Sequence, residues 1–102
     1  MSDAPDQDAR RRAVELLEAN HDFPCQFSFS VIAISDQATT AAILSALSDG
    51  EEMTLEPEAH QKVPSSGGKY TSHRLRIPCA SADHVLDLFA RLRAVTGVVT
   101  VL

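Results

Sequence analysis

Hydrophobic and polar residues alternate in two segments, residues 25–34 and 69–79, and this pattern predicts two β-strands. In the first segment the odd positions carry Cys25, Phe27, Phe29, Val31 and Ala33. In the second, the odd positions include Leu75 and Ile77, and the even positions carry Tyr70, Ser72, Arg74 and Arg76. Because successive side chains of a strand point to opposite faces of a sheet, we expect the odd positions to face the core.

Two other segments repeat their apolar residues at helical spacing. Residues 37–48 follow a capping residue, Ser35 or Asp36, and their apolar stripe consists of Thr40, Ile43, Leu44 and Leu47. A second helix is capped by Ser81 and stopped by Gly97, and its stripe consists of Val85, Leu88, Phe89, Leu92 and Val95. Residues 9–20 are good helix formers with a narrow apolar stripe, so we expect a short helix that docks onto the domain.

The remaining segments predict two more strands and a tail. Residues 52–63 carry apolar side chains at most odd positions, namely Met53, Leu55, Pro57, Ala59 and Val63. Pro57 places this strand at a sheet edge because proline cannot donate to the ladder. Residues 98–102 are valine-rich and form the last strand. Residues 1–8 are small, acidic and proline-containing, so we expect a disordered tail.

The order of the elements predicts an α+β fold. After the N-terminal helix they run strand, helix, strand, strand, helix, strand. Two right-handed β-α-β crossovers interleave into one antiparallel four-stranded sheet with spatial order 4-1-3-2 and both helices on one face. This is the ferredoxin-like βαββαβ sandwich, and we expect residues 9–102 to form a single domain.

Length and charge exclude several classes of protein. A chain of 102 residues is long enough for one core and too short for two typical domains. The net charge of −5 disfavours nucleic-acid binding, which needs a basic face. The apolar runs are too short to span a membrane, and the N-terminus lacks the features of a signal peptide. We therefore expect a cytoplasmic protein that binds neither nucleic acid nor membrane.

The sequence resembles the YbeD-like family of small bacterial domains, which is related in fold to ACT regulatory domains. The resemblance covers about residues 14–102. It rests on Phe23-Pro24 with the first strand, on Lys69-Tyr70-x-Ser72 at the start of the third, and on the valine-rich strand that ends at Leu102. It implies a small regulatory or interaction domain, with dimer formation among its expected properties. Ser30 and Ala33 depart from the family, which commonly has Lys and Gly there.

The residues that could carry chemistry are dispersed. The four histidines, His21, His60, His73 and His84, show no metal-ligand spacing, so we expect no metal site, with His73 half-buried and the others facing solvent. Cys25 and Cys79 lie on neighbouring strands and can approach each other. The two cysteines can be interpreted as a redox pair or as two small, buried, apolar side chains. We favour the second interpretation. No nucleophile motif is present, so we predict neither an enzyme nor a cofactor.

The helix-free face of the sheet is the candidate binding surface. It is predicted to carry Tyr70, Ser72, Arg74 and Arg76 from the third strand beside Ser28 and Ser30 from the first. Tyr and Arg are enriched at interface hot spots, and arginine suits a carboxylate partner. We expect binding of a protein, including a second copy of this chain, at this face or at the edge strand 98–102. The alternative is a sensor of an anionic metabolite or amino acid.

Overall fold

Four strands form one antiparallel sheet in the order β2-β3-β1-β4, as the sequence predicted. The strands are β1 (Cys25–Ile34), β2 (His60–Pro64), β3 (Tyr70–Cys79) and β4 (Val98–Val101). The computed structural model of the chain describes residues 3–48 and 57–102. Within this part, β1 and β3 are the long central strands and pair along their full length, from Cys25 opposite Cys79 to Ile34 opposite Tyr70.

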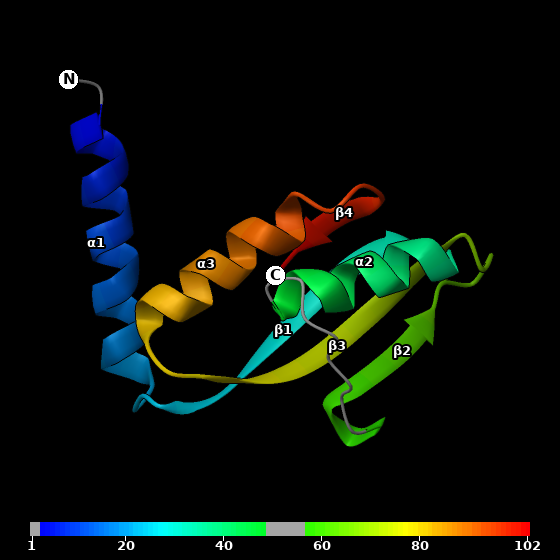
Figure 1. Cartoon of the computed structure of the whole chain (residues 1–102), viewed down its shortest axis with the longest axis horizontal. Helices are drawn as coiled ribbons and strands as arrows, with labels where there is room; N and C mark the ends of the chain where they lie inside the picture. Colours follow the sequence, from blue (N-terminus) through cyan, green and yellow to red (C-terminus); the bar gives the residue numbers. More distant parts are fainter. Residues whose placement is uncertain (1–2, 49–56) are drawn as a thin grey trace.

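Two helices, α2 (Gln37–Leu47) and α3 (Ala82–Arg93), cover one face of this sheet (Figure 1). Each begins at a capping side chain. Asp36 accepts a hydrogen bond from the Ala38 backbone N–H at 3.0 Å, and Ser81 accepts one from the His84 N–H at 3.1 Å. These bonds satisfy N–H groups that the first turn leaves without a partner. The fold is the predicted ferredoxin-like sandwich.

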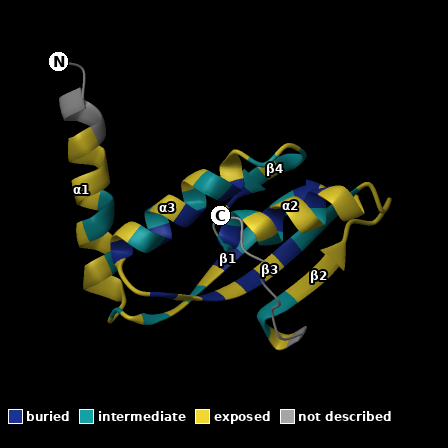
Figure 2. Ribbon diagram, in the orientation of Figure 1, coloured by how far each residue is buried: buried dark blue, intermediate teal, exposed yellow. Residues whose placement is uncertain are grey.

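The core lies between the helices and the odd positions of β1 and β3 (Figure 2). Phe29 contacts Phe89 of α3 edge-on, with 5.0 Å between the ring centroids. Burying an aromatic or branched aliphatic side chain of this kind stabilises the fold by roughly 1.5–3 kcal/mol. The predicted inward positions are confirmed by the most deeply buried side chains, which include Phe29, Val31, Ala33, Ile43, Leu75, Ile77, Val85, Leu88 and Leu92.

Gly97 occupies the turn between α3 and β4. Its φ of 97° lies in the left-handed region, which glycine adopts without steric cost. A Cβ at this position would lie 2.8 Å from the Thr39 hydroxyl oxygen. The Gly97 carbonyl accepts a hydrogen bond from the Ile34 N–H at 2.9 Å, and this bond joins the turn to β1.

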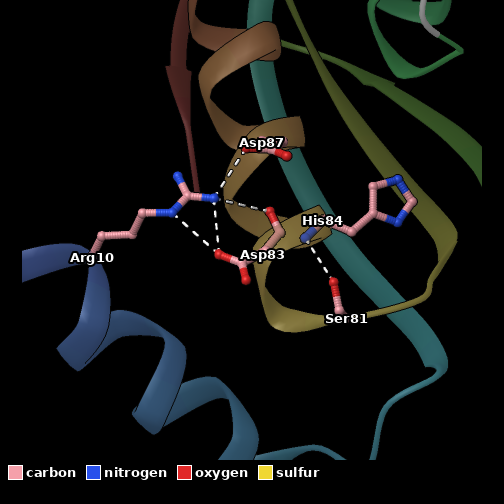
Figure 3. Close-up of polar contacts among 5 residues, drawn as sticks. All are labelled: Arg10, Ser81, Asp83, His84 and Asp87. Carbon is pink, nitrogen blue, oxygen red and sulfur yellow. Dashed lines mark hydrogen bonds and ion pairs between the residues drawn. The ribbon is translucent and has the colours of Figure 1, made fainter. Parts of the chain in front are cut away.

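The N-terminal helix α1 (Asp3–Asn20) stands at one end of the sandwich beside α3 (Figure 1). It begins at Asp3 rather than at residue 9, so it includes most of the segment expected to be a disordered tail. Arg10 holds it to α3: one guanidinium nitrogen lies 3.0 Å from an Asp83 carboxylate oxygen and 3.1 Å from an Asp87 carboxylate oxygen (Figure 3). These side chains are about half exposed, so the ion pairs add little stability.

The second strand is shorter than predicted and begins later. Strand structure was expected over residues 52–63, but Pro57–Ala59 form a 3-10 helix, η1, and β2 runs from His60 to Pro64. Proline favours the first position of a helical turn, where it needs no N–H partner, and this explains the correction. Residues 52–56 lie outside the described part. The prediction that this strand lies at a sheet edge is confirmed.

Candidate functional site

The helix-free face of the sheet carries the residues that the sequence singled out. In β1 and β3 the even positions point to this face because their odd neighbours are buried. The register places Ser28 opposite Arg76 and Ser30 opposite Arg74. Gln61 of β2 lies opposite Arg74 on its other side. Directly opposite side chains in a sheet are close neighbours, so these five residues form one group.

A pocket of about 190 Å³ lies over this group. Its polar lining residues are Ser28, Ser30, Glu58, Gln61, Arg74 and Arg76. We call this set the arginine pocket. Four of its members were predicted from strand parity. Glu58 and Gln61 were not, because their segment was assigned to a longer strand with a different beginning.

Arg74 and Arg76 are exposed, and neither guanidinium forms an ion pair or hydrogen bond with another described residue. An arginine presents up to five N–H donors in a planar fork that matches the two oxygens of a carboxylate. Glu58 contributes one negative charge to the lining, so the arginine pocket carries two positive charges and one negative charge. The pocket can therefore accept a carboxylate.

Tyr70 and Ser72 lie on the same face but outside the arginine pocket. They occupy the other end of β3, opposite Ile34 and Ile32. Ile34 is 38% exposed and Val63 of β2, opposite Ser72, is 48% exposed. We call Tyr70, Ser72, Ile32, Ile34 and Val63 the Tyr70 patch. The structure thus divides the six predicted site residues into a polar group of four, two of them charged, and a more apolar region that contains the other two.

A histidine pair on the helix-covered side was not predicted. His60 Nε2 lies 3.0 Å from His73 Nδ1. His73 is 1% exposed, so the expectation of a half-buried side chain is wrong, and His60 is partly buried rather than facing solvent. The prediction failed because the apolar pattern of residues 52–63 lies at odd positions, whereas the even residues of β2 share the helix-covered side, with His60 opposite the buried Leu75. Counting outward from the turn at Ser65 would have placed the two rings beside each other.

The surroundings of both rings disfavour the charged form. Burial, followed by the neighbouring His60 and Lys62, lowers the pKa of His73 to about 4. Burial and Lys62 also lower the pKa of His60. His73 Nε2 is buried with no hydrogen-bond partner among the described residues. Buried N–H groups without a partner are rarer in proteins than buried acceptors without one, which favours the form in which His73 Nδ1–H donates to His60 Nε2.

Two other observations concern the described residues. Residues 3–48 and 57–102 contain no group of three or more His, Cys, Asp or Glu side chains arranged to hold a metal ion. Of the helices in these two segments, none combines the length and apolar composition that crossing a bilayer requires.

The comparison with known proteins agrees with the fold and with the resemblance noted in the sequence. Residues 18–102 match the profile of a family described as "Protein of unknown function (DUF493)". The chain belongs to this family. The matched segment contains the whole sandwich, while most of α1 precedes it. The assignment is consistent with the YbeD-like family of small bacterial proteins.

Relatives of this DUF493 protein carry the name UPF0250. The protein from Shewanella putrefaciens is 32% identical over 81 residues, which is 79% of this chain and 89% of the relative. One from Shewanella baltica is 31% identical over the same shares. One from Shewanella sp. strain ANA-3 is 31% identical over 88 residues, 86% of this chain and 92% of the relative. No solved structure matches. None of these names states an enzymatic activity.

Proposed function

We propose that this DUF493 protein is a non-enzymatic, ACT-like regulatory domain that binds the carboxylates of a protein partner on its helix-free sheet face. The observation that carries the proposal is the pair of exposed guanidiniums, Arg74 and Arg76, neither of which is paired with another described residue. In a chain of net charge −5, two adjacent unpaired arginines form a local positive site. Such a site attracts an acidic partner and orients it.

The form of the surface favours a protein over a small molecule. The arginine pocket holds about 190 Å³, whereas sites that enclose small ligands usually hold about 300–1,000 Å³. The Tyr70 patch extends the same face with exposed apolar surface. Aromatic and arginine side chains together are typical of interface hot spots. A second copy of this chain is the first partner to test, because β4 is an edge strand of the sheet and the next residue, Leu102, is 69% exposed.

The arrangement of side chains supports a binding role rather than catalysis. Activation of the Ser28 or Ser30 hydroxyl would require a general base within hydrogen-bond reach. The His60–His73 pair lies on the opposite side of the sheet, because His73 is buried against the helices and His60 pairs opposite the buried Leu75. These histidines cannot serve serines on the helix-free face. Glu58, the carboxylate that lines the same pocket, forms no hydrogen bond with either serine in the described part of the chain.

Charge reversal tests the proposal. The double variant Arg74→Glu/Arg76→Glu replaces the proposed carboxylate-binding groups. Arg11→Glu/Arg12→Glu makes the same change in net charge on α1, far from the pocket. Light scattering measures self-association, and affinity capture followed by titration of the purified partner measures binding to another protein. We expect the first variant to lose the interaction and the control to keep it. The proposal is contradicted if light scattering shows that the wild-type protein is a monomer and if every captured partner binds both variants equally well.

The alternative function is a sensor of an anionic metabolite or amino acid at the same arginines. A ligand that binds only the folded state raises the melting temperature with its concentration. A thermal-shift series of amino acids and organic acids therefore distinguishes the two functions. A concentration-dependent shift that is absent in Arg74→Ala/Arg76→Ala supports the sensor. If no compound in the series raises the melting temperature, the sensor function is ruled out.

A further inference from the structure

The two cysteines occupy directly opposite positions where β1 begins and β3 ends. Cys25 pairs with Cys79 in the antiparallel register, and both side chains are on the helix-facing side. The backbone N–H and C=O of Ser30 form hydrogen bonds with Leu102, on the β4 side of β1. Because these groups alternate in direction along a strand, the odd residues of β1 direct their N–H and C=O groups toward β3. Opposite residues of this hydrogen-bonded kind have Cα atoms about 5.5 Å apart. A disulfide requires about 4.4–6.8 Å, so the backbone can accommodate one.

The two thiols differ in accessibility. Cys25 is partly exposed and Cys79 is 1% exposed. Burial, with a smaller contribution from the adjacent Cys25, raises the pKa of the Cys79 thiol to about 11. Because the thiolate is the reactive form, Cys25 is the cysteine that an external oxidant reaches first.

A pocket opens beside this pair. It has a volume of about 410 Å³, and its lining includes Cys25 and Cys79 together with Pro24, Pro78, Ala80 and His84. The surroundings are mostly apolar. Both cysteines line this pocket, and of the two only Cys25 is partly exposed to solvent.

We propose that Cys25 and Cys79 form a reversible thiol–disulfide pair that reacts with low-molecular-weight disulfides such as oxidised glutathione. The Cys25 thiolate attacks one sulfur of the disulfide, forms a mixed disulfide and releases one thiolate. The Cys79 thiolate then attacks Cys25 Sγ, forms the Cys25–Cys79 bond and releases the second small thiol. The protein loses two protons and two electrons, and the small disulfide is reduced to two thiols. Pairs of this kind in reducing compartments serve redox sensing.

The test exposes the reduced, full-length protein to oxidised glutathione and follows its intact mass. We expect the wild-type mass to fall by two hydrogen atoms with no glutathione retained, and dithiothreitol to restore it. Peptide mapping without reductant should identify the Cys25–Cys79 link. Cys79→Ser should stop at the mixed disulfide on Cys25. Cys25→Ser should not react while folded.

The wild-type protein alone decides the matter if a variant does not fold. A stable glutathione adduct on wild-type Cys25 would mean that Cys79 cannot close the bridge, and this overturns the proposal. A covalent dimer, or no reaction of the folded protein, overturns it as well. Because closure needs the Cys79 thiolate, its rate should rise about tenfold per pH unit between about pH 7 and 9. A rate independent of pH in this range contradicts the assigned order of attack.

Discussion

Mild acid should destabilise the fold through the His60–His73 pair. Only one proton can lie between His60 Nε2 and His73 Nδ1, which are 3.0 Å apart. A further proton on the neutral pair would place two N–H groups against each other, or would leave an N–H of the buried His73 without a partner. The folded protein therefore resists protonation of these rings, whereas the unfolded chain accepts protons freely.

The pKa values give the size of the effect. The pKa of His73 is about 4 in the folded protein, against 6.5 for an unperturbed histidine. When folding lowers the pKa of a group, the protein loses stability as the pH falls from the pKa of the unfolded chain toward the pKa of the folded protein. For His73 the free energy of unfolding should fall by about 2 kcal/mol between pH 7.5 and 5, and by about 3 kcal/mol below pH 4. The lowered pKa of His60 acts in the same direction.

Urea denaturation followed by circular dichroism at pH 7.5, 6 and 5 measures this loss. His73→Leu removes the buried ring at similar volume and should stay within about 1.5 kcal/mol of wild type at pH 7.5. Its loss between pH 7.5 and 5 should be about 2 kcal/mol smaller than that of wild type. His21→Gln removes an exposed histidine and serves as the control. If wild type and His73→Leu lose equal stability over this range, the assignment to the pair is refuted.

Three further substitutions test the packing of the fold and the attachment of α1. Gly97→Ala should lower the free energy of unfolding by about 1–3 kcal/mol, because its positive φ and the close approach of α2 both oppose a side chain. Gly67→Ala, which meets no atom within 4 Å, should be nearly neutral by the same urea measurement. Phe29→Ala should cost about 3–5 kcal/mol as a core truncation. Arg10→Ala should speed amide exchange in α1 and scarcely change the melting temperature, and Arg12→Ala should change neither.

The strand order and the buried residues could be predicted because they depend on local patterns. The alternation in residues 25–34 and 70–79 determined which side chains face the helices, and the structure confirms it. Parity also placed Ser28, Ser30, Arg74 and Arg76 on one face. Their assembly into a single pocket follows from the β1–β3 register.

The parts that were missed depend on the position of one short strand. The odd-position pattern in residues 52–63 resembled a strand, but His60 to Pro64 form it and Pro57–Ala59 turn instead. That difference determines which β2 residues lie beside β3. It explains why both the histidine pair and the contribution of Gln61 to the arginine pocket could not be read from periodicity alone.

The alternation along β3 also has a consequence for how this protein can change during evolution. Leu75 and Ile77 are buried in the core, whereas Arg74 and Arg76 are exposed and form no side-chain hydrogen bond or ion pair with another described residue. Substitutions at these exposed positions alter charge and shape on the surface at little cost in stability. The charge and shape of this face can therefore change while the sandwich stays the same.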